Sequence, residues 1–202
     1  MPNEKDKLLK IFNKYATANV KSIGIGMGST MLKFSEILPS KYLYFPASNQ
    51  TLMFLKNKTV SSLQNASTMD LYFDGADYYD CFGNLIKGGG GALTVEKLMI
   101  NMSKKSVIVV QNNKYVNSFE ELAIPVEILK ESYGYFLRVL KDHSVQVNYD
   151  SWIISVPFLT DNGNYIVDVN FDYDFIQDCK RFSGVIEHGY VSNNLKFEIE
   201  EI

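Results

Sequence analysis

Two carboxylates, a lysine, a run of glycines and a glutamate lie within one short stretch of this chain. Asp74 and Asp77 come first, Lys87 leads into Gly88 to Gly91, and Glu96 follows. Four consecutive glycines lose much backbone entropy on folding, so the run needs a geometric reason such as positive φ or close approach to a ligand. Acids on both sides of such a loop suggest a site that moves protons beside a polar substrate. A solvated surface loop is the simpler alternative.

A second polar group follows a short apolar run near the N-terminus. Ser22 to Gly26 is predicted to be a strand and Met31 to Leu38 a helix, and the turn Met27 to Thr30 lies between them. Such a turn can bind an anion, because backbone N–H groups and hydroxyls converge where the helix dipole favours phosphate. It is neither a Walker P-loop nor a full dinucleotide fingerprint, so alone it is a weak signal.

The order of the elements places both polar groups at one edge of a predicted sheet. The predicted elements are strands over 42–45, 69–73 and 106–111, and helices over 4–18, 49–56 and 93–102. Their alternation predicts a doubly wound, mostly parallel sheet. In such open sheets ligands bind beyond the carboxyl ends of the strands, where the turn at Met27 to Thr30 and the pair Asp74 and Asp77 both fall. This convergence argues against a solvated loop.

The pattern changes in the second half of the chain. The predicted elements there are strands over 124–129, 164–171 and 185–191, helices over 133–141 and 173–182, and an extended segment over 144–160. Asp161-Asn-Gly163 is typical of a hairpin turn. The β-α-β-β-α-β order is that of a ferredoxin-like α+β domain. We therefore expect an α/β fold with a Rossmann-like catalytic domain over 1–123 plus 195–202, and a smaller domain over 124–194 that serves oligomerisation.

Composition excludes several classes of protein. The chain has 202 residues, 46% of them hydrophobic and 21% charged, with a net charge of −3 and interspersed signs. A nucleic-acid binder would usually show a clustered basic face, so nucleic acid is not expected as a partner. The chain has no apolar run near 18 residues, so a membrane is not expected either. Cys81 and Cys179 are far apart and form no metal-ligand spacing. We expect a cytoplasmic protein with reduced thiols and no signal peptide.

Six motifs, taken in order, resemble those of one enzyme family. They are Gly24-Ile-Gly-Met-Gly-Ser-Thr30, Asp74-Gly-Ala-Asp77, Leu85-Ile-Lys-Gly-Gly-Gly-Gly-Ala-Leu-Thr-Val-Glu-Lys97, Pro125-Val-Glu-Ile128, Thr160-Asp-Asn-Gly-Asn164 and Gly184-Val-Ile-Glu-His-Gly189. Through them the chain resembles ribose-5-phosphate isomerase of the A type over nearly its whole length. The resemblance implies interconversion of D-ribose 5-phosphate and D-ribulose 5-phosphate through an enediolate. It also implies no metal or organic cofactor, and a homodimer or homotetramer.

The resemblance also implies a role for individual residues. Glu96 matches the general base that moves a proton between C2 and C1 of the open-chain sugar. Asp74, Asp77 and Lys87 match the residues around the sugar oxygens, implicated in ring opening and in stabilising the enediolate. The residues that match substrate or phosphate contacts are Met27, Gly28, Ser29, Thr30, Gly75, Ala76, Gly88, Gly89, Gly90, Lys114 and Lys7. Elementary chemistry agrees, since an enediol mechanism needs one base and donors where oxygen gains negative charge.

The chain departs from the family pattern in two places. The family usually has threonine at the position of Met27, so one hydroxyl of the phosphate turn is missing. The segment Asp142 to Phe158 lacks the expected Gly-Gly pattern. We expect surface and structural roles for His143 and His188, and a core or interface position for Trp152.

Two other functions fit parts of the sequence. A magnesium-dependent phosphatase would use Asp74 and Asp77, although the further carboxylates that such a site needs are not evident. A sugar-phosphate-sensing domain of related fold would bind without turnover and would have no need of Glu96 and Lys87. An incidental βα scaffold is a third, weaker alternative.

Overall fold

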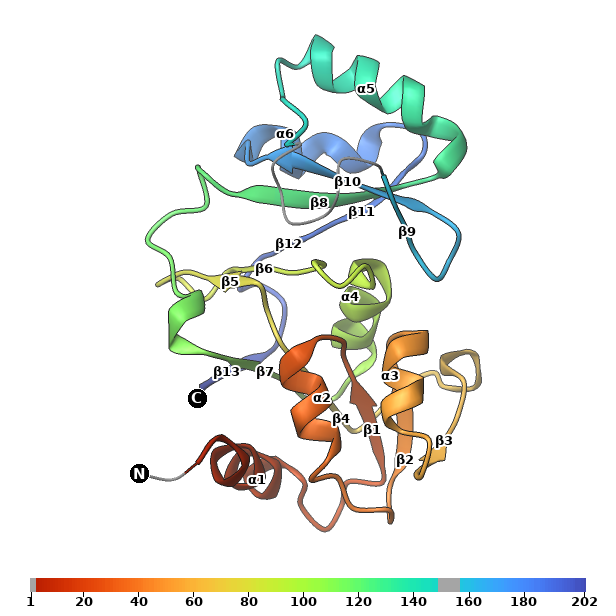
Figure 1. Ribbon diagram of the computed structural model, residues 1–202, viewed down its shortest axis with the longest axis vertical. Coiled ribbons are helices and arrows are strands. Elements are labelled where there is room, and N and C mark those ends of the chain that lie inside the picture. Colours follow the sequence, from red (N-terminus) through yellow and green to blue (C-terminus); the bar gives the residue numbers. More distant parts are fainter. Residues whose placement is uncertain (1–2, 149–156) are drawn as a thin grey trace. The chain divides into compact units, whose positions relative to one another are not determined.

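The computed structural model describes residues 3–148 and 157–202 and contains two compact units (Figure 1). The first unit consists of residues 1–76, 95–114 and 193–202, and the second of residues 77–94 and 115–192. Residues 77–94 and 115–122, which we expected in the larger domain, group with the second unit. Our domain limits stay a prediction. Trp152 and part of the predicted 144–160 segment lie outside the described residues.

The first unit contains a six-stranded sheet in which every pair of strands is parallel. In spatial order the strands are β13 (Glu198–Glu201), β7 (Ser106–Val110), β4 (Leu71–Asp74), β1 (Ser22–Ile25), β2 (Leu43–Pro46) and β3 (Thr59–Val60). The predicted parallel sheet and the return of the last residues to it are confirmed. The two-residue strand β3 had no clear pattern in the sequence.

Helices cover both faces of this sheet, as expected for a doubly wound fold. They are α1 (Glu4–Tyr15), α2 (Ser29–Ser35), α3 (Asn49–Phe54) and α4 (Leu93–Met102), with short 3-10 turns at Leu63–Asn65 and Asn112–Lys114. Apolar side chains of α1 and α2 form one core with Ile23, Phe73 and Val107 of the strands. Residues on the opposite face of the strands meet α4, since a Cβ on Gly24 would lie 2.7 Å from Cε of Met99.

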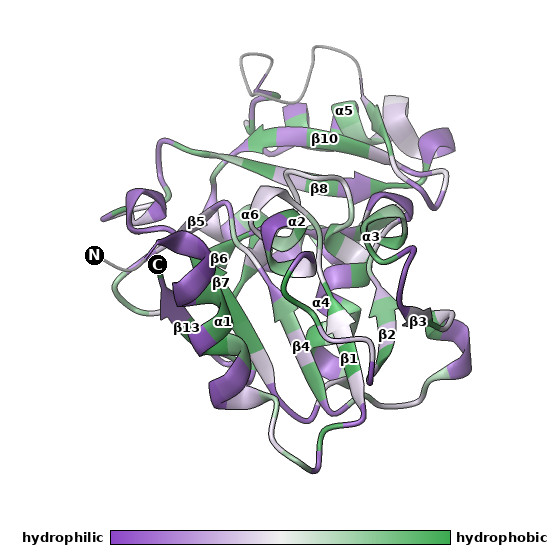
Figure 2. Cartoon of the chain, turned by 60° about the horizontal axis from the view of Figure 1, so that its bottom comes forward, coloured by the Kyte–Doolittle hydropathy of each residue, from purple (hydrophilic) through white to green (hydrophobic). Residues whose placement is uncertain are grey.

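Hydropathy along the strands matches these positions. Figure 2 shows β7 green along its length and β13 purple. All five residues of β7 are buried, whereas β13 has the sequence Glu-Ile-Glu-Glu and is partly exposed at the sheet edge. A fully buried strand reads as a continuous apolar run, which is why β7 was easy to predict.

The second unit contains the predicted ferredoxin-like arrangement. Its four-stranded sheet has the order β11 (Val185–His188), β8 (Ala123–Ile128), β10 (Tyr165–Asn170) and β9 (Phe158–Leu159), and every pair is antiparallel. Two helices, α5 (Tyr133–Asp142) and α6 (Tyr173–Asp178), pack on it, with 3-10 turns at Lys130–Ser132 and Cys179–Arg181. The hairpin turn is confirmed, because Gly163 has φ +79° and the Gly163 N–H donates to the Thr160 carbonyl oxygen at 2.9 Å.

The predicted strand over 185–191 is wrong as a single element. It is interrupted at Gly189, and its second part, β12 (Tyr190–Val191), joins a separate three-stranded sheet with β6 (Leu85–Ile86) and β5 (Tyr78–Tyr79). The interruption has a steric cause, since a Cβ on Gly189 would lie 2.2 Å from the Lys87 carbonyl oxygen. The predicted helix over 173–182 likewise ends at Asp178 and continues as a 3-10 turn.

No helix in residues 3–148 and 157–202 is long and apolar enough to span a membrane.

Asp70 ties together the starting ends of three strands. Its Oδ2 atom accepts hydrogen bonds from the backbone N–H groups of Lys21 and Ser22 at 2.9 and 3.1 Å, and its Oδ1 atom accepts one from Lys104 Nζ at 2.7 Å. The Lys104 bond, with the two backbone donors, lowers the pKa of Asp70 against the opposing effect of burial. A carboxyl with a lowered folded-state pKa stabilises the fold above its unfolded pKa of about 4, and that contribution is lost as the pH falls below it.

The Asp70→Asn variant should therefore be less stable than the parent at pH 7, by roughly 2 kcal/mol, because bonds to a charged acceptor are lost. The difference should shrink as the pH falls below about 4, because the unfolded parent then binds a proton that folded Asp70 resists. Urea unfolding at both pH values measures it. Asp178→Asn is the matched control, since its ion pair with Arg181 is exposed on both sides and such pairs contribute little. A pH-independent difference would contradict this role for the Asp70 charge.

Candidate active site

Three of the predicted site segments gather at the carboxyl edge of the first unit's sheet. The turn Met27 to Thr30 follows β1, Asp74 ends β4, and Lys114 closes the 3-10 turn after β7. These three strands are neighbours, in the order β7, β4, β1. The chain leaves β1 for β2 on one side, while β4 lies on the other, so β1 and β4 flank the point where the strand order reverses. Ligands of open α/β sheets bind at such a switch point.

The turn after β1 leaves room for a ligand next to its glycine. Gly28 has φ +116°, which favours glycine, and a Cβ built on it would meet no atom within 4 Å. Gly28 precedes the first residue of α2, Ser29, which is exposed, whereas Met27 and Thr30 are half-buried. The backbone of the turn is fixed from one side, since Thr51 Oγ1 donates to the Gly26 carbonyl oxygen at 2.8 Å.

Asp74 is buried and its carboxylate is held on three sides. The backbone N–H of Gly75 donates to Oδ1 at 2.7 Å, and the hydroxyl of Tyr72 donates to Oδ2. The Cα of Gly26 faces the same group, because a Cβ there would lie 1.9 Å from Oδ1. The side chain of Asp74 is 0% exposed. An acid so enclosed has a single orientation.

The negative charges of Asp74 and Glu96 both act on the hydroxyl of Tyr72. Tyr72 and Asp74 share the face of β4 opposite Phe73, and both are fully buried. Burial first, and then the negative charges of Asp74 and Glu96, raise the pKa of Tyr72 well above its usual value. Glu96 lies in the first turn of α4 and is 3% exposed. The structure thus brings Asp74 and Glu96 near one tyrosine hydroxyl, which sequence reasoning did not single out.

The glycine run and its lysine form a tight loop in the second unit. Asp77 Oδ2 accepts a hydrogen bond from the Gly89 N–H at 2.9 Å, and the Gly91 N–H donates to the Gly88 carbonyl oxygen at 2.8 Å. Gly88 and Gly91 have φ of +106° and +87°, so the run does serve a geometry that favours glycine. Lys87 is 3% exposed, which is rare for a lysine outside a functional or paired setting. The Gly89 amide donates to Asp77 and the Gly91 amide to Gly88, so the positive charge of this loop comes from Lys87.

A buried glutamate fixes the residues just before Glu96, and sequence reasoning gave it no role. Glu127 is 0% exposed in β8 and accepts hydrogen bonds from Thr94 Oγ1 at 2.5 Å, Asn164 Nδ2 at 2.8 Å and Thr160 Oγ1 at 3.2 Å. Thr94 is in the first turn of α4, two residues before Glu96. The signal for Glu127 was a charged residue inside an apolar strand, Ile124 to Ile128, which a buried strand does not tolerate without partners.

The remaining predicted contacts lie elsewhere on the molecule. Lys7 is exposed on α1 and lines a cavity of about 540 Å³ together with Lys10, Lys14 and Glu200. Ala76 and Gly90 lie in the loops after β4 and β6, half-buried and exposed respectively. His143 is exposed beside Phe182, and His188 is half-buried in β11 with its backbone N–H bonded to Glu187. No three His, Cys, Asp or Glu side chains gather as metal ligands in the part of the chain that the structure describes.

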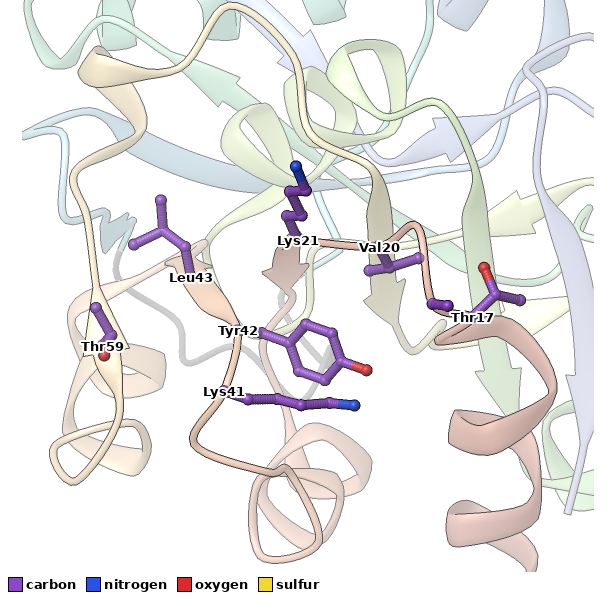
Figure 3. Close-up of a pocket in the computed structure, with 8 residues that line it drawn as sticks. Thr17, Val20, Lys21, Lys41, Tyr42, Leu43 and Thr59 are labelled. Carbon is purple, nitrogen blue, oxygen red and sulfur yellow. The ribbon is translucent and has the colours of Figure 1, made fainter.

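A further cavity of about 480 Å³ opens at the opposite edge of the first unit's sheet, where the strands begin. Figure 3 shows Lys21 pointing away from the Tyr42 ring while Lys41 lies along that ring, 4.9 Å from its centre. The two ammonium groups do not converge, so this cavity does not have the arrangement of an anion site.

Comparison with known proteins identifies the family. The family model of ribose 5-phosphate isomerase A (phosphoriboisomerase A) matches residues 43–198. The chain is 32% identical to ribose-5-phosphate isomerase A 1 of Oceanobacillus iheyensis, over 93% of this chain and 91% of that one. It is 34% identical to ribose-5-phosphate isomerase A of Archaeoglobus fulgidus, over 86% and 84%.

Solved structures agree with the sequence comparison. The chain superimposes on ribose 5-phosphate isomerase A of Methanocaldococcus jannaschii with a TM-score of 0.81 and 27% identity, covering 98% of this chain and 93% of that one. A second isomerase structure, which is in complex with phospho-erythronic acid, gives a TM-score of 0.82 at 25% identity, with 100% and 96% covered. The predicted Rossmann-like fold with a smaller α+β part is therefore confirmed. The chain belongs to the ribose 5-phosphate isomerase A family.

Proposed function

We propose that this chain interconverts D-ribose 5-phosphate and D-ribulose 5-phosphate with Glu96 as the base. Membership of the isomerase family supports this reaction, and it does not favour the phosphatase or the non-catalytic sensor. The observation that supports the choice of base is the burial of Glu96 in the first turn of α4, with its charge close to the same hydroxyl that binds Asp74. A base withheld from water and fixed on a helix is suited to abstract a weakly acidic C–H proton.

The reaction then needs only one base and a set of donors. Glu96 removes the proton from C2 of the open-chain aldose, and the electron pair forms the C1–C2 double bond while O1 gains the negative charge of an enediolate. The O2 proton then passes to O1, and the same carboxyl returns its proton to C1 as O2 forms the carbonyl of the ketose. The ammonium group of Lys87 stabilises the negative charge that develops on oxygen, an electrostatic contribution often worth about 3 kcal/mol.

The different surroundings of the two aspartates support different roles. Asp74 is fully buried and held by Tyr72 and Gly75, so it acts as a fixed acceptor for a sugar hydroxyl. Asp77 accepts a bond from Gly89 and is only half-buried, and this exposure gives the access that proton transfer during ring opening requires. Gly75, Ala76 and the loop glycines contribute backbone contacts to the sugar.

The turn at Met27 to Thr30 is our candidate for the phosphate end of the substrate. Its support is the open space at Gly28 and the exposed start of α2 at Ser29. Lys114, in the 3-10 turn after β7, adds positive charge. Lys7 lines the cavity beside α1, and its contact with the phosphate stays a prediction. The complex of a related isomerase with phospho-erythronic acid supports a phosphorylated ligand for this family. Binding energy at the phosphate helps to orient the reacting carbons.

Purified protein incubated with ribose 5-phosphate and excess chelator tests this function. We expect ketose to accumulate at an unchanged rate with and without chelator, and we expect ribose without phosphate to react far more slowly. Absence of ketose would contradict the isomerase, and release of inorganic phosphate that chelator abolishes would favour the phosphatase alternative with a metal at Asp74 and Asp77.

We also propose a cytoplasmic homodimer or homotetramer, with no nucleic acid or membrane as partner. Support for self-association comes from β9, which lies at the edge of the second unit's described sheet with Phe158 and Leu159 exposed. Exposed apolar edge strands tend to pair with another chain. Cys81 is an exposed free thiol, which suits a reducing compartment. Light scattering of the purified chain distinguishes monomer, dimer and tetramer.

A further inference from the structure

One buried titratable group enters the mechanism above only as a hydrogen-bond partner of Asp74. Tyr72 is 0% exposed in the middle of β4, and its hydroxyl donates to Oδ2 of Asp74. Its ring is held tightly, because a Cβ on Gly24 in the neighbouring strand would lie 2.9 Å from Tyr72 Cδ2. A packed ring and a bound hydroxyl leave this side chain no other orientation.

The Tyr72 hydroxyl keeps its proton under all working conditions. Burial and the charges of Asp74 and Glu96 raise the pKa of Tyr72 far above neutrality, so the group can donate a hydrogen bond but cannot serve as a base. The hydroxyl contacts Asp74 at the end of β4, and the charge of Glu96 in the first turn of α4 also acts on it within the first unit. Because this hydroxyl always donates, it fixes the position of the negative charge of Asp74.

We propose that Tyr72 is a positioning residue for the isomerisation, whose hydroxyl fixes the Asp74 carboxylate for the sugar and keeps it apart from Glu96. This inference rests on the proposed roles of Asp74 and Glu96. Tyr72 fixes one carboxylate oxygen and Gly75 the other, while the Cα of Gly26 closes the third side. Without the hydroxyl, Asp74 can rotate, and reacting groups misplaced by about 1 Å can slow an enzyme roughly 100-fold.

The test compares two tyrosine-to-phenylalanine variants. Tyr72→Phe keeps the packed ring and removes the hydroxyl, and we expect kcat for ribose 5-phosphate to fall about tenfold or more with KM changed by less than about threefold. Tyr44→Phe is the matched control. Tyr44 is also 0% exposed, in strand β2 of the same sheet, and its hydroxyl donates to the Pro39 carbonyl oxygen at 2.6 Å, away from the site. We expect this variant to keep kcat within about twofold, even though it also loses a buried hydrogen bond.

A double variant separates positioning from a general loss of structure. If the hydroxyl acts through Asp74, then Tyr72→Phe should have little further effect on kcat in an Asp74→Asn background, because coupled residues are not additive. Additive losses, equal losses in Tyr72→Phe and Tyr44→Phe, or an undiminished kcat in Tyr72→Phe would each overturn the inference. If Tyr72→Phe does not fold, Tyr72→Met is assayed in its place, because methionine also lacks the donor and adapts to irregular space.

The same assays distinguish a failure of the proposed function from a failure of this inference. If the unmodified chain does not isomerise ribose 5-phosphate, then the function itself is wrong and the inference falls with it. If the chain turns over and Glu96→Gln does not, while Tyr72→Phe keeps full kcat, then only the positioning role of Tyr72 is wrong.

Discussion

Replacing Glu96 with glutamine is expected to lower kcat for ribose 5-phosphate by about 1,000-fold, within the range of roughly 100- to 10,000-fold that a positioned acid–base group contributes. Glutamine has nearly the same shape but cannot accept the C2 proton. Because Glu96 is buried in the first turn of α4 rather than exposed at its surface, the amide should occupy the same space. KM should change little, since substrate binding does not depend on the proton transfer. Steady-state assays of ketose formation measure both constants.

A matched control shows whether the loss belongs to this position. Glu131 has a side chain 72% exposed in the second unit, so Glu131→Gln should keep full activity. An active Glu96→Gln variant would mean that another group abstracts the proton. Asp74 and Asp77 would then be the next candidates.

Gly26→Ala should be nearly as damaging, although the change adds only one methyl group. The new Cβ would lie 1.9 Å from Oδ1 and 2.0 Å from Cγ of Asp74, at a position enclosed by β1 and β4. Either the strand ends separate or Asp74 leaves its place against Tyr72 and Gly75. Overpacking of this kind costs about 1 to 3 kcal/mol of folding free energy. A displaced Asp74 should in addition lower kcat about 100-fold, because reacting groups need close placement.

Gly134→Ala is the control for the same chemical change in a permissive place. Gly134 lies in α5, and a Cβ there would meet no atom within 4 Å. Alanine favours a helix over glycine by about 1 kcal/mol, so this variant should be as stable as the parent or more so. Thermal unfolding and kcat are measured for both variants. An active and stable Gly26→Ala protein would show that Asp74 does not need the position seen in the structure.

Much of the catalytic edge could be predicted from local sequence alone. The apolar runs at Ser22 to Ile25 and Ser106 to Val110 are strands buried at every position but Ser22, and their carboxyl ends had to share one edge of a parallel sheet. The turn with Gly28 and the acid Asp74 follow directly from those strands. The resemblance to the isomerase family then implied roles that strand order cannot supply, above all the choice of Glu96 as base.

The missed features depend on side-chain directions and contacts that the sequence does not show. Tyr72 looked like an ordinary aromatic residue in a strand, and only the structure shows its hydroxyl against Asp74 near the charge of Glu96. Glu127 gained its meaning from Thr94 in α4 and from Thr160 and Asn164 of the hairpin turn, which lie in two distant segments. The break at Gly189 was invisible because the Lys87 carbonyl that requires it lies about 100 residues earlier.

The most direct test of the proton-transfer mechanism is to run the reaction in D₂O and locate deuterium in the product. If Glu96 carries the proton between C2 and C1, then some of it exchanges with solvent, and ribulose 5-phosphate formed by the unmodified chain should contain deuterium bound to C1. Glu96→Gln should show neither turnover nor exchange. Ribulose 5-phosphate that forms at the normal rate with no deuterium on carbon would indicate direct hydrogen transfer from C2 to C1, and it would contradict the enediolate mechanism proposed here.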